Sequence, residues 1–348
     1  MPGKRTKSST KATTAKDVTP RSGKKQRTNK ASTKAATTVA ASGTTTTTTT
    51  TCSQQDVAGC IFIDVKGRKG LFTGQVNVLY GQAGQPPVLE YVKGTLVYED
   101  EGCKGNTYQG EFHQGYMQGQ GTFTTKSSGD VFEGTFVKDE FERGKITYGN
   151  GDSYEGECRG EEGTKHGKGT FRRTDKDNGF TMKGTWKNDE LNGDGVLTFN
   201  DGDEYKGGFK NGEHHGHGTY TFNNAKEEDC RQYTGEWKLG KKHGLGRMEY
   251  KDGSHYVGEW QHNEPTGQGR ATYVDEDFVE YAGTLKNGTI HGVGTLTYRN
   301  GQVYCGFLKQ GKRHGLGELV ELDGTRWVGE WRDDQKHGIG STYHYETL

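Results

Sequence analysis

The residues best suited to chemistry in this chain are histidines that recur at one position, directly before a Gly-x-Gly. Six of the twelve histidines do so: His166, His215, His243, His291, His314 and His337. Imidazole binds transition metals and titrates near neutral pH, which would suit a metal site or a pH sensor. If each histidine lies on its own pair of strands, equivalent atoms are roughly 9–10 Å apart. Zinc needs ligands at about 2 Å, so neighbouring histidines cannot share one ion. We therefore predict no metal site, and we assign these histidines to turns and the surface, where protonation below about pH 6.5 would change the charge.

Glycine-rich segments offer a second chemistry, the cradling of phosphate groups. Gly306-Phe-Leu-Lys-Gln-Gly-Lys-Arg313 comes close to a phosphate-binding loop, but it lacks the terminal Ser or Thr and precedes a strand-like segment. The repeats contain nine intact Gly-x-Gly pairs, all in the same repeating context. A fingerprint repeated nine times is a structural pattern, so we expect no nucleotide and no other cofactor.

Carboxylates and thiols could support catalysis, but their placement argues against it. Glu236, Glu259 and Glu330 each follow a glycine, and alternation predicts that they point outward to form a solvated face. No Ser-His-Asp or Cys-His arrangement stands out. The cysteines show no paired spacing, which suits reduced intracellular thiols; they are Cys52, Cys60, Cys103, Cys158, Cys230 and Cys305. We predict that the chain is not an enzyme and has no catalytic residue.

One pattern positions all of these residues: an aromatic-x-Gly, a short polar stretch, a Gly-x-Gly and a strand-like tail. Its clearest copy runs from Tyr233 to Gly253, and the next copies begin 23, 25, 23 and 23 residues apart. A fixed period of this length indicates a repeat architecture. The copies begin at Tyr108, Phe132, Tyr154, Met182, Tyr205, Tyr233, Tyr256, Tyr281, Tyr304 and Trp327.

Within each copy, apolar or small residues alternate with polar ones, which predicts two strands with one buried face. The joints between copies carry Asn-Gly or Asp-Gly, as at Asn150-Gly151 and Asp252-Gly253, and these supply the positive φ of tight hairpin turns. The hydrophobic share is only 28% but there are 57 glycines, so we expect rings seated on glycine instead of an aliphatic core. The predicted fold is all-β: an elongated, twisted antiparallel meander that spans roughly 95 Å.

The pattern also divides the chain. Residues 1–55 are a low-complexity, Thr- and Lys-rich segment that we predict to be disordered. Residues 56–107 form a degenerate leading region, expected to be β structure with an irregular loop at Pro86-Pro87. Residues 108–348 hold about ten tandem copies. Those at Phe132, Tyr154 and Met182 should be the least regular, since the first has Glu142 where a glycine belongs.

The array resembles MORN (membrane occupation and recognition nexus) repeats, whose pattern is close to Tyr-x-Gly-x-Trp, several polar residues and Gly-x-Gly. The likeness covers about 240 of 348 residues. It implies a non-catalytic scaffold that mediates protein contacts and often self-associates, and phospholipid binding has been proposed for many members. Some members regulate a kinase or a lysine methyltransferase, but the leading region is too short for either catalytic domain.

The chain has a net charge of zero, but its N-terminal segment is basic and the remainder is acidic. Residues 1–55 carry eleven cations and one anion, and the remainder carries 35 cations and 45 anions. A basic arm on an acidic body points to an electrostatic contact. Its candidate residues are Arg21, Lys24, Lys25 and Arg27. They would suit an anionic membrane, an import receptor, nucleic acid or the protein's own acidic body.

The sequence therefore predicts a non-enzymatic repeat scaffold that mediates protein–protein interaction along a rod-like β surface. The alternative is a membrane-associated adaptor that binds anionic phospholipid through the basic tail. A third reading is a regulatory subunit that acts on a kinase or methyltransferase in trans. We expect cytoplasmic localisation, with cytoskeletal or membrane association, and nuclear localisation as the alternative. No stretch approaches the roughly 18 apolar residues of a spanning helix. The final strand, at Ser341–Glu346, leaves an open sheet edge that would allow self-association.

Overall fold

The computed structural model of the chain describes residues 52–79, 88–223, 230–274 and 276–344. The predicted disorder of the tail, its residues Arg21, Lys24, Lys25 and Arg27, and the loop at Pro86-Pro87 lie outside the described residues. The first strand begins at Cys52, before the predicted boundary at residue 55.

All regular secondary structure in the described ranges is β-strand, 23 strands in total, so the all-β prediction is confirmed. The chain divides into two units. The N-terminal unit consists of the described chain up to Thr174 and a second, short segment, Trp186–Asp189. Its strands are β1 (Cys52–Ile63), β2 (Lys69–Leu79), β3 (Val88–Tyr98), β4 (Thr107–His113), β5 (Tyr116–Thr124), β6 (Val131–Val137), β7 (Glu140–Thr147), β8 (Ser153–Arg159) and β9 (Thr164–Arg173).

The C-terminal unit comprises Asp175–Thr185 and the chain from Glu190 onward, so β10 contributes residues to both units. Its strands are β10 (Phe180–Lys187), β11 (Glu190–Phe199), β12 (Glu204–Lys210), β13 (Glu213–Thr221), β14 (Cys230–Lys238), β15 (Lys241–Tyr250), β16 (His255–Gln261), β17 (Glu264–Thr272), β18 (Phe278–Lys286), β19 (Thr289–Tyr298), β20 (Val303–Lys309), β21 (Lys312–Val320), β22 (Arg326–Arg332) and β23 (Gln335–Tyr343). None of the described residues forms a helix that could cross a membrane.

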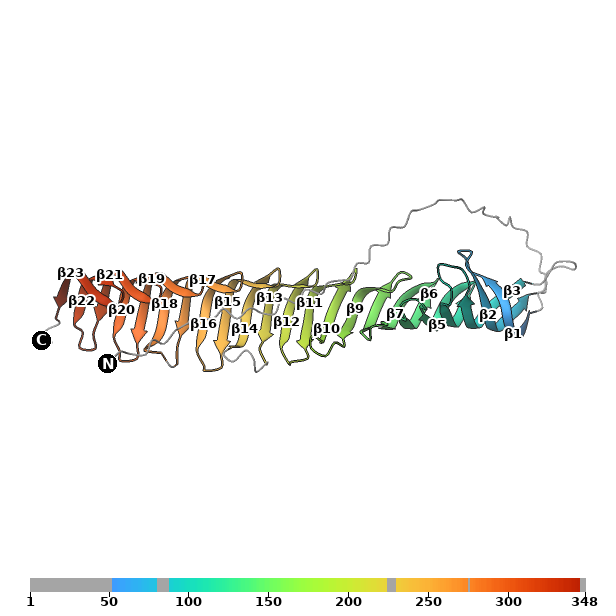
Figure 1. Cartoon of the computed structure of the whole chain (residues 1–348), viewed down its shortest axis with the longest axis horizontal. Helices are drawn as coiled ribbons and strands as arrows, with labels where there is room; N and C mark the ends of the chain where they lie inside the picture. The colour runs from blue at the N-terminus through green and yellow to red at the C-terminus, as the bar shows by residue number, and fades with distance from the viewer. Residues whose placement is uncertain (1–51, 80–87, 224–229, 275, 345–348) are drawn as a thin grey trace. The chain divides into compact units, whose positions relative to one another are not determined.

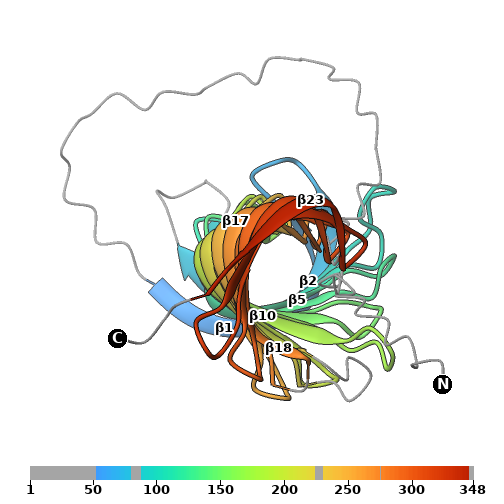
Figure 2. The ribbon, with the colours of Figure 1, turned by 90° about the vertical axis from the view of Figure 1, so that its left-hand side faces the viewer.

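Within each unit, each strand pairs antiparallel with the next one in the chain, which is the predicted meander (Figure 1). Viewed end-on, the strands of the C-terminal unit, such as β17 and β23, are strongly curved (Figure 2). The rings lie on one face of the sheet, which we call the inner face, and the polar residues between them lie on the outer face.

Two kinds of turn join the strands. At the joints between copies, glycines such as Gly151 and Gly253 do adopt positive φ, as predicted, with values of 88° and 92°. The two-residue turns with positive φ at both positions lie inside the copies instead. Several contain no glycine, for example Lys138-Asp139 (49° and 70°) and His262-Asn263 (52° and 76°). Such turns match the right-handed twist of a hairpin. The two-residue hairpin turns therefore lie in the polar stretch inside each copy, and not at the joints between copies.

The core consists of rings, as predicted. Tyr233 is fully buried and packs edge-on against Trp237 and Trp260, with centroids 5.2 and 5.1 Å away. Seven tyrosine hydroxyls donate to the carbonyl three residues later at 2.7–3.1 Å: Tyr108, Tyr154, Tyr205, Tyr233, Tyr256, Tyr281 and Tyr304. These bonds satisfy the polar tip of each buried ring, which would be costly to leave unpaired.

Each strand of a pair places a glycine opposite a glycine, as at Gly235 and Gly246. A Cβ on Gly246 would lie 2.6 Å from Cε2 and Cζ of Tyr233, so this glycine does seat a ring. The first glycine of the pair has another role. Gly244 has φ +60° in a β-bulge, and a Cβ there would meet the carboxylate of Glu236 on the outer face. The prediction that rings are seated on glycine is therefore confirmed for the second glycine of this Gly-x-Gly and does not hold for the first.

Candidate functional site

The glycines of neighbouring strands form a continuous row, and over β3–β6 this row is the floor of a groove on the outer face. Gly94, Gly110, Gly121 and Gly134 are successive partners in the register. The groove has a volume of about 540 Å³. We call it the glycine groove. It is lined by Lys93, Gly94, Thr95, Gln109, Gly110, Gln120, Gly121, Thr122, Glu133 and Gly134.

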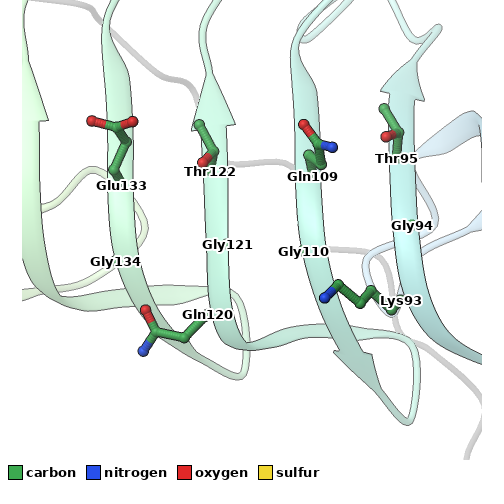
Figure 3. A pocket seen from close by; sticks show the side chains of 10 residues that line it. All are labelled: Lys93, Gly94, Thr95, Gln109, Gly110, Gln120, Gly121, Thr122, Glu133 and Gly134. Carbon is green, nitrogen blue, oxygen red and sulfur yellow. The ribbon is translucent and has the colours of Figure 1, made fainter.

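Two walls of side chains border the glycine floor. Figure 3 shows Thr95, Gln109, Thr122 and Glu133 on one side of the glycine row and Lys93 and Gln120 on the other. All come from alternate positions of their strands, which is why they share the outer face. Most of the walls are uncharged amides and hydroxyls, which can both donate and accept hydrogen bonds.

The polar lining of the groove is suited to hydrogen bonding with a partner. Its ten lining residues include no Ser, Cys or His. Gln120 Nε2 already donates to Thr135 Oγ1 at 2.9 Å, which holds one amide in place on the wall. The glycines of the floor face inward, where the rings of Phe72 and Tyr108 fill their Cβ positions, so on the outer face the floor between the walls is bare backbone. The arrangement suits an extended polypeptide whose own amides need partners.

The six pattern histidines sit beside the bulges, on separate strand pairs, as their spacing required. His243 pairs with Glu236 in the register and His337 with Glu330. Within the described ranges, no group of three or more His, Cys, Asp or Glu side chains could hold a metal ion. The suggestion that these histidines titrate together remains a prediction.

Another histidine, His214, has the more unusual environment. Its ring is buried and stacks on Tyr205 with centroids 3.7 Å apart. Burial lowers its pKa to about 3, so it stays neutral in the core. The sequence did not single out this residue, although it precedes a pattern histidine, His215.

The acidic residues that were expected to form a solvated face do point outward, with Glu259 and Glu330 exposed and Glu236 half-buried, and they also have a structural role. Glu236 Oε1 accepts the backbone N–H of Leu245 at 3.1 Å, and Glu259 Oε1 accepts that of Gln268 at 3.0 Å. The Glu330 carboxylate lies over Gly338 in the same way. They lie on the outer face, as alternation predicted, but each closes a β-bulge.

Neither the phosphate-loop likeness nor the cysteines form a site. In the segment Gly306–Arg313, Gly306 is in strand β20 and Gly311 is in a two-residue turn that leads into strand β21, not a helix. Burial raises the pKa of the Cys158 thiol to about 12, which makes it a poor nucleophile. The five cysteines whose side chains are described form no disulfide.

Sequence reasoning also missed a set of cations that lie against the rings, which we call the ring-bound cations. Lys242 has 0% exposure, and its Nζ lies 5.2–5.5 Å from the centroids of Phe222, Tyr233 and Trp260. The guanidinium of Arg313 lies 4.2 Å from the Trp331 ring. In the repeat array the set comprises Lys165, Lys242, Arg313 and Lys336. The sequence feature that could have identified these cations is a basic residue directly before a pattern histidine.

Comparison with known families supports the repeat analysis. The MORN repeat model matches residues 108–129, 161–177, 183–204, 205–225, 233–255, 256–278, 281–303, 304–325 and 327–344. It leaves unmatched residues 130–160, which contain the copy at Phe132 with its missing glycine.

No curated protein matches the chain. Among solved structures, the chain is similar to the TCP domain of SAS-4 (dCPAP) of Drosophila melanogaster, solved in complex with a proline-rich motif of Ana2 (dSTIL). The two are 13% identical, and the likeness covers 51% of this chain and 84% of that one with a TM-score of 0.23. A TM-score this low carries nothing over to this chain.

Proposed function

Because the chain belongs to the MORN repeat family, whose model matches more than half of its residues, we propose that it is a non-enzymatic scaffold for protein partners. MORN repeat proteins are generally not enzymes, and the partner would bind along the outer face of the sheet. The glycine groove is the single observation that carries this function. For its location we propose the cytoplasm, in association with the cytoskeleton or a membrane, with the nucleus as the alternative.

The groove favours a partner in an extended conformation. Its floor is the backbone at four inward-facing glycines, and its walls offer amides and hydroxyls from Gln109, Gln120 and Thr122. An extended chain presents unpaired N–H and C=O groups at regular intervals, and these walls can pair with them. Lys93 and Glu133 are the only charged residues among the lining, so charge has a small part in selecting the partner.

A groove-filling substitution tests the proposal. Thr122→Trp places a large ring over the glycine floor from the outer face, away from the ring core. Thr295→Trp is the matched control, because Thr295 holds the same position in its own copy, on β19 and outside the groove. Quantitative affinity purification of the full-length protein should lose specific partners with Thr122→Trp and keep them with Thr295→Trp. An unchanged set of partners with Thr122→Trp would contradict binding in the groove.

A membrane-associated adaptor is the second candidate, and the charge of residues 1–55 favours it. Eleven cations against one anion would attract an anionic lipid surface, with each added cation worth about 1 kcal/mol near it. Co-sedimentation with phosphatidylserine vesicles, with and without residues 1–55, separates the two functions. Salt-sensitive binding that requires the tail would support the adaptor, and an absence of binding at low salt would exclude it.

A further inference from the structure

Strand β1 is an open edge of the N-terminal unit. It is a strand of 12 residues, and within the described ranges it pairs only with β2. An unpaired edge presents a row of N–H and C=O groups to any other strand. Proteins usually protect such an edge with lysine, proline or a very short strand. β1 has neither lysine nor proline, and Asp56 is its only charged residue.

The exposed side chains of β1 are apolar near its end. Ile61 is 71% exposed and Ile63 is 58% exposed, both on the outer face. Ile61 lies opposite Leu71 on β2, and Leu71 lies opposite Val97 on β3. Leu71 and Val97 are 39% and 37% exposed. An apolar row therefore crosses three strands and stops at the open edge, and exposed apolar rows of this kind mark interaction sites.

The other end of the array is protected differently. Strand β23 carries Lys336 and two glycines, and every one of its residues is exposed. At the position opposite the ring of each copy, β23 has Thr342, whereas β21 has Leu319 and β19 has Leu296. A polar residue in a core position is the mark of a solvent-facing cap. The edge self-association that the sequence suggested for the last strand is better suited to β1.

We propose that β1 pairs antiparallel with β1 of a second copy of this chain and joins the two sheets edge to edge. A β-bulge at Gly59 divides the register of β1 into two regular segments, Cys52–Val57 and Cys60–Ile63, and the second carries the exposed Ile61 and Ile63. If Phe62 lies opposite Phe62 of the second copy, Ile61 lies opposite Ile63 in both directions. The two-fold axis then keeps the outer faces together, and the two apolar rows, each of three strands, meet at the axis with an offset of two residues.

The second copy fits this edge because it brings an identical apolar row and no charge among Cys60–Ile63. Charge also selects the antiparallel arrangement. The segment before β1 carries the excess of positive charge, and a parallel pairing would bring two such segments together. About ten residues separate Cys52 from the pairing centre in each copy, so antiparallel pairing sets the two start points roughly 65 Å apart. Pairing through β1 leaves the glycine groove free, because the groove lies over β3–β6.

The test is the mass of the full chain by light scattering over about 1–100 μM. We expect the mass to approach twice the 38.4 kDa of one chain as concentration rises. The double variant Ile61→Lys with Ile63→Lys opposes like charges across the axis and should raise the dimer dissociation constant at least about tenfold. Ile339→Lys, on the exposed face of β23, is the matched control and should leave the constant unchanged. A wild-type protein that stays monomeric overturns the proposal, as does a constant that the double variant does not raise.

A charge-swap experiment separates loss of pairing from loss of folding. Copies with Ile61→Glu and Ile63→Glu should be monomeric alone, as should the lysine copies. Mixed in equal amounts, the two should form a heterodimer, because each lysine then lies opposite a glutamate. Circular dichroism of each variant checks that both are folded before mixing. Folded variants whose mixture remains monomeric would show that β1 docks something other than a second copy.

Discussion

Replacing Gly246 with alanine should destabilise the C-terminal unit strongly. The added Cβ would lie 2.6 Å from Cε2 and Cζ of Tyr233. That ring cannot move aside, because it is fully buried and Trp237 and Trp260 pack against it at 5.2 and 5.1 Å. Overpacking of this kind costs about 1–3 kcal/mol. Displacing the hydroxyl also breaks its 3.0 Å bond to the Glu236 carbonyl, which adds about 1 kcal/mol. The expected loss is about 2–4 kcal/mol.

Two other glycines separate crowding from backbone strain. A Cβ on Gly102 would meet nothing within 4 Å, so Gly102→Ala should change the free energy of unfolding by less than about 0.5 kcal/mol. A Cβ on Gly216 would also meet nothing, but its φ is +71°, and Gly216→Ala should cost about 1–2 kcal/mol from strain alone. Tyr233→Phe removes the atom nearest to the added Cβ, so it should recover part of the loss in the Gly246→Ala background.

Urea unfolding followed by tryptophan fluorescence measures these differences, since Trp237 and Trp260 both contact the affected ring. The order of destabilisation should be Gly246→Ala, then Gly216→Ala, then Gly102→Ala. If Gly246→Ala were as mild as Gly102→Ala, rings would not be seated on glycine and the explanation of the core would be wrong.

Two further predictions concern buried groups. The pKa of His214 is about 3 in the folded protein, so below about pH 6.5 only the unfolded chain binds a proton at this residue. The free energy of unfolding should therefore decrease as the pH is lowered below about 6.5, by up to about 1.4 kcal/mol per pH unit. His214→Leu, which copies the residue at Leu191, should reduce the fall in urea midpoint between pH 7 and 5; an unaltered pH dependence would contradict the neutral, buried state. Arg313→Met should cost about 1–2 kcal/mol, because it removes the cation over the Trp331 ring together with the guanidinium bonds to Asp334. Lys309→Met on the same hairpin should cost almost nothing, and equal effects on the urea midpoint would argue against a stabilising role of Arg313.

The sequence was sufficient for the parts of the fold that repeat. The spacing of Tyr233, Tyr256 and Tyr281 set the hairpins, and the alternation around Gly235 and Gly246 set the buried face. Those features depend on residues within one strand or on its direct partner. They can be predicted from a short stretch of sequence because each copy repeats the same spacing of rings and glycines.

Other features depend on residues that meet only after the strands pair and curve. Gly244 and Gly246 look alike in sequence, but a bulge gives the first a positive φ under Glu236 and leaves the second beneath Tyr233. Lys242 reads as one of many surface lysines until Phe222 and Trp260 close around it. The glycine groove was missed for the same reason, because its walls come from four strands and no single copy contains them.

The most direct test of the scaffold function is photo-crosslinking from inside the glycine groove. A photoreactive amino acid at Gln109, on the wall of the groove, should capture a partner, and peptide mapping should place the crosslinks within one extended segment of it. The same residue at Thr295, on the outer face beyond the groove, should capture far less of that partner. Equal capture at both positions, or none at Gln109, would contradict binding along the groove.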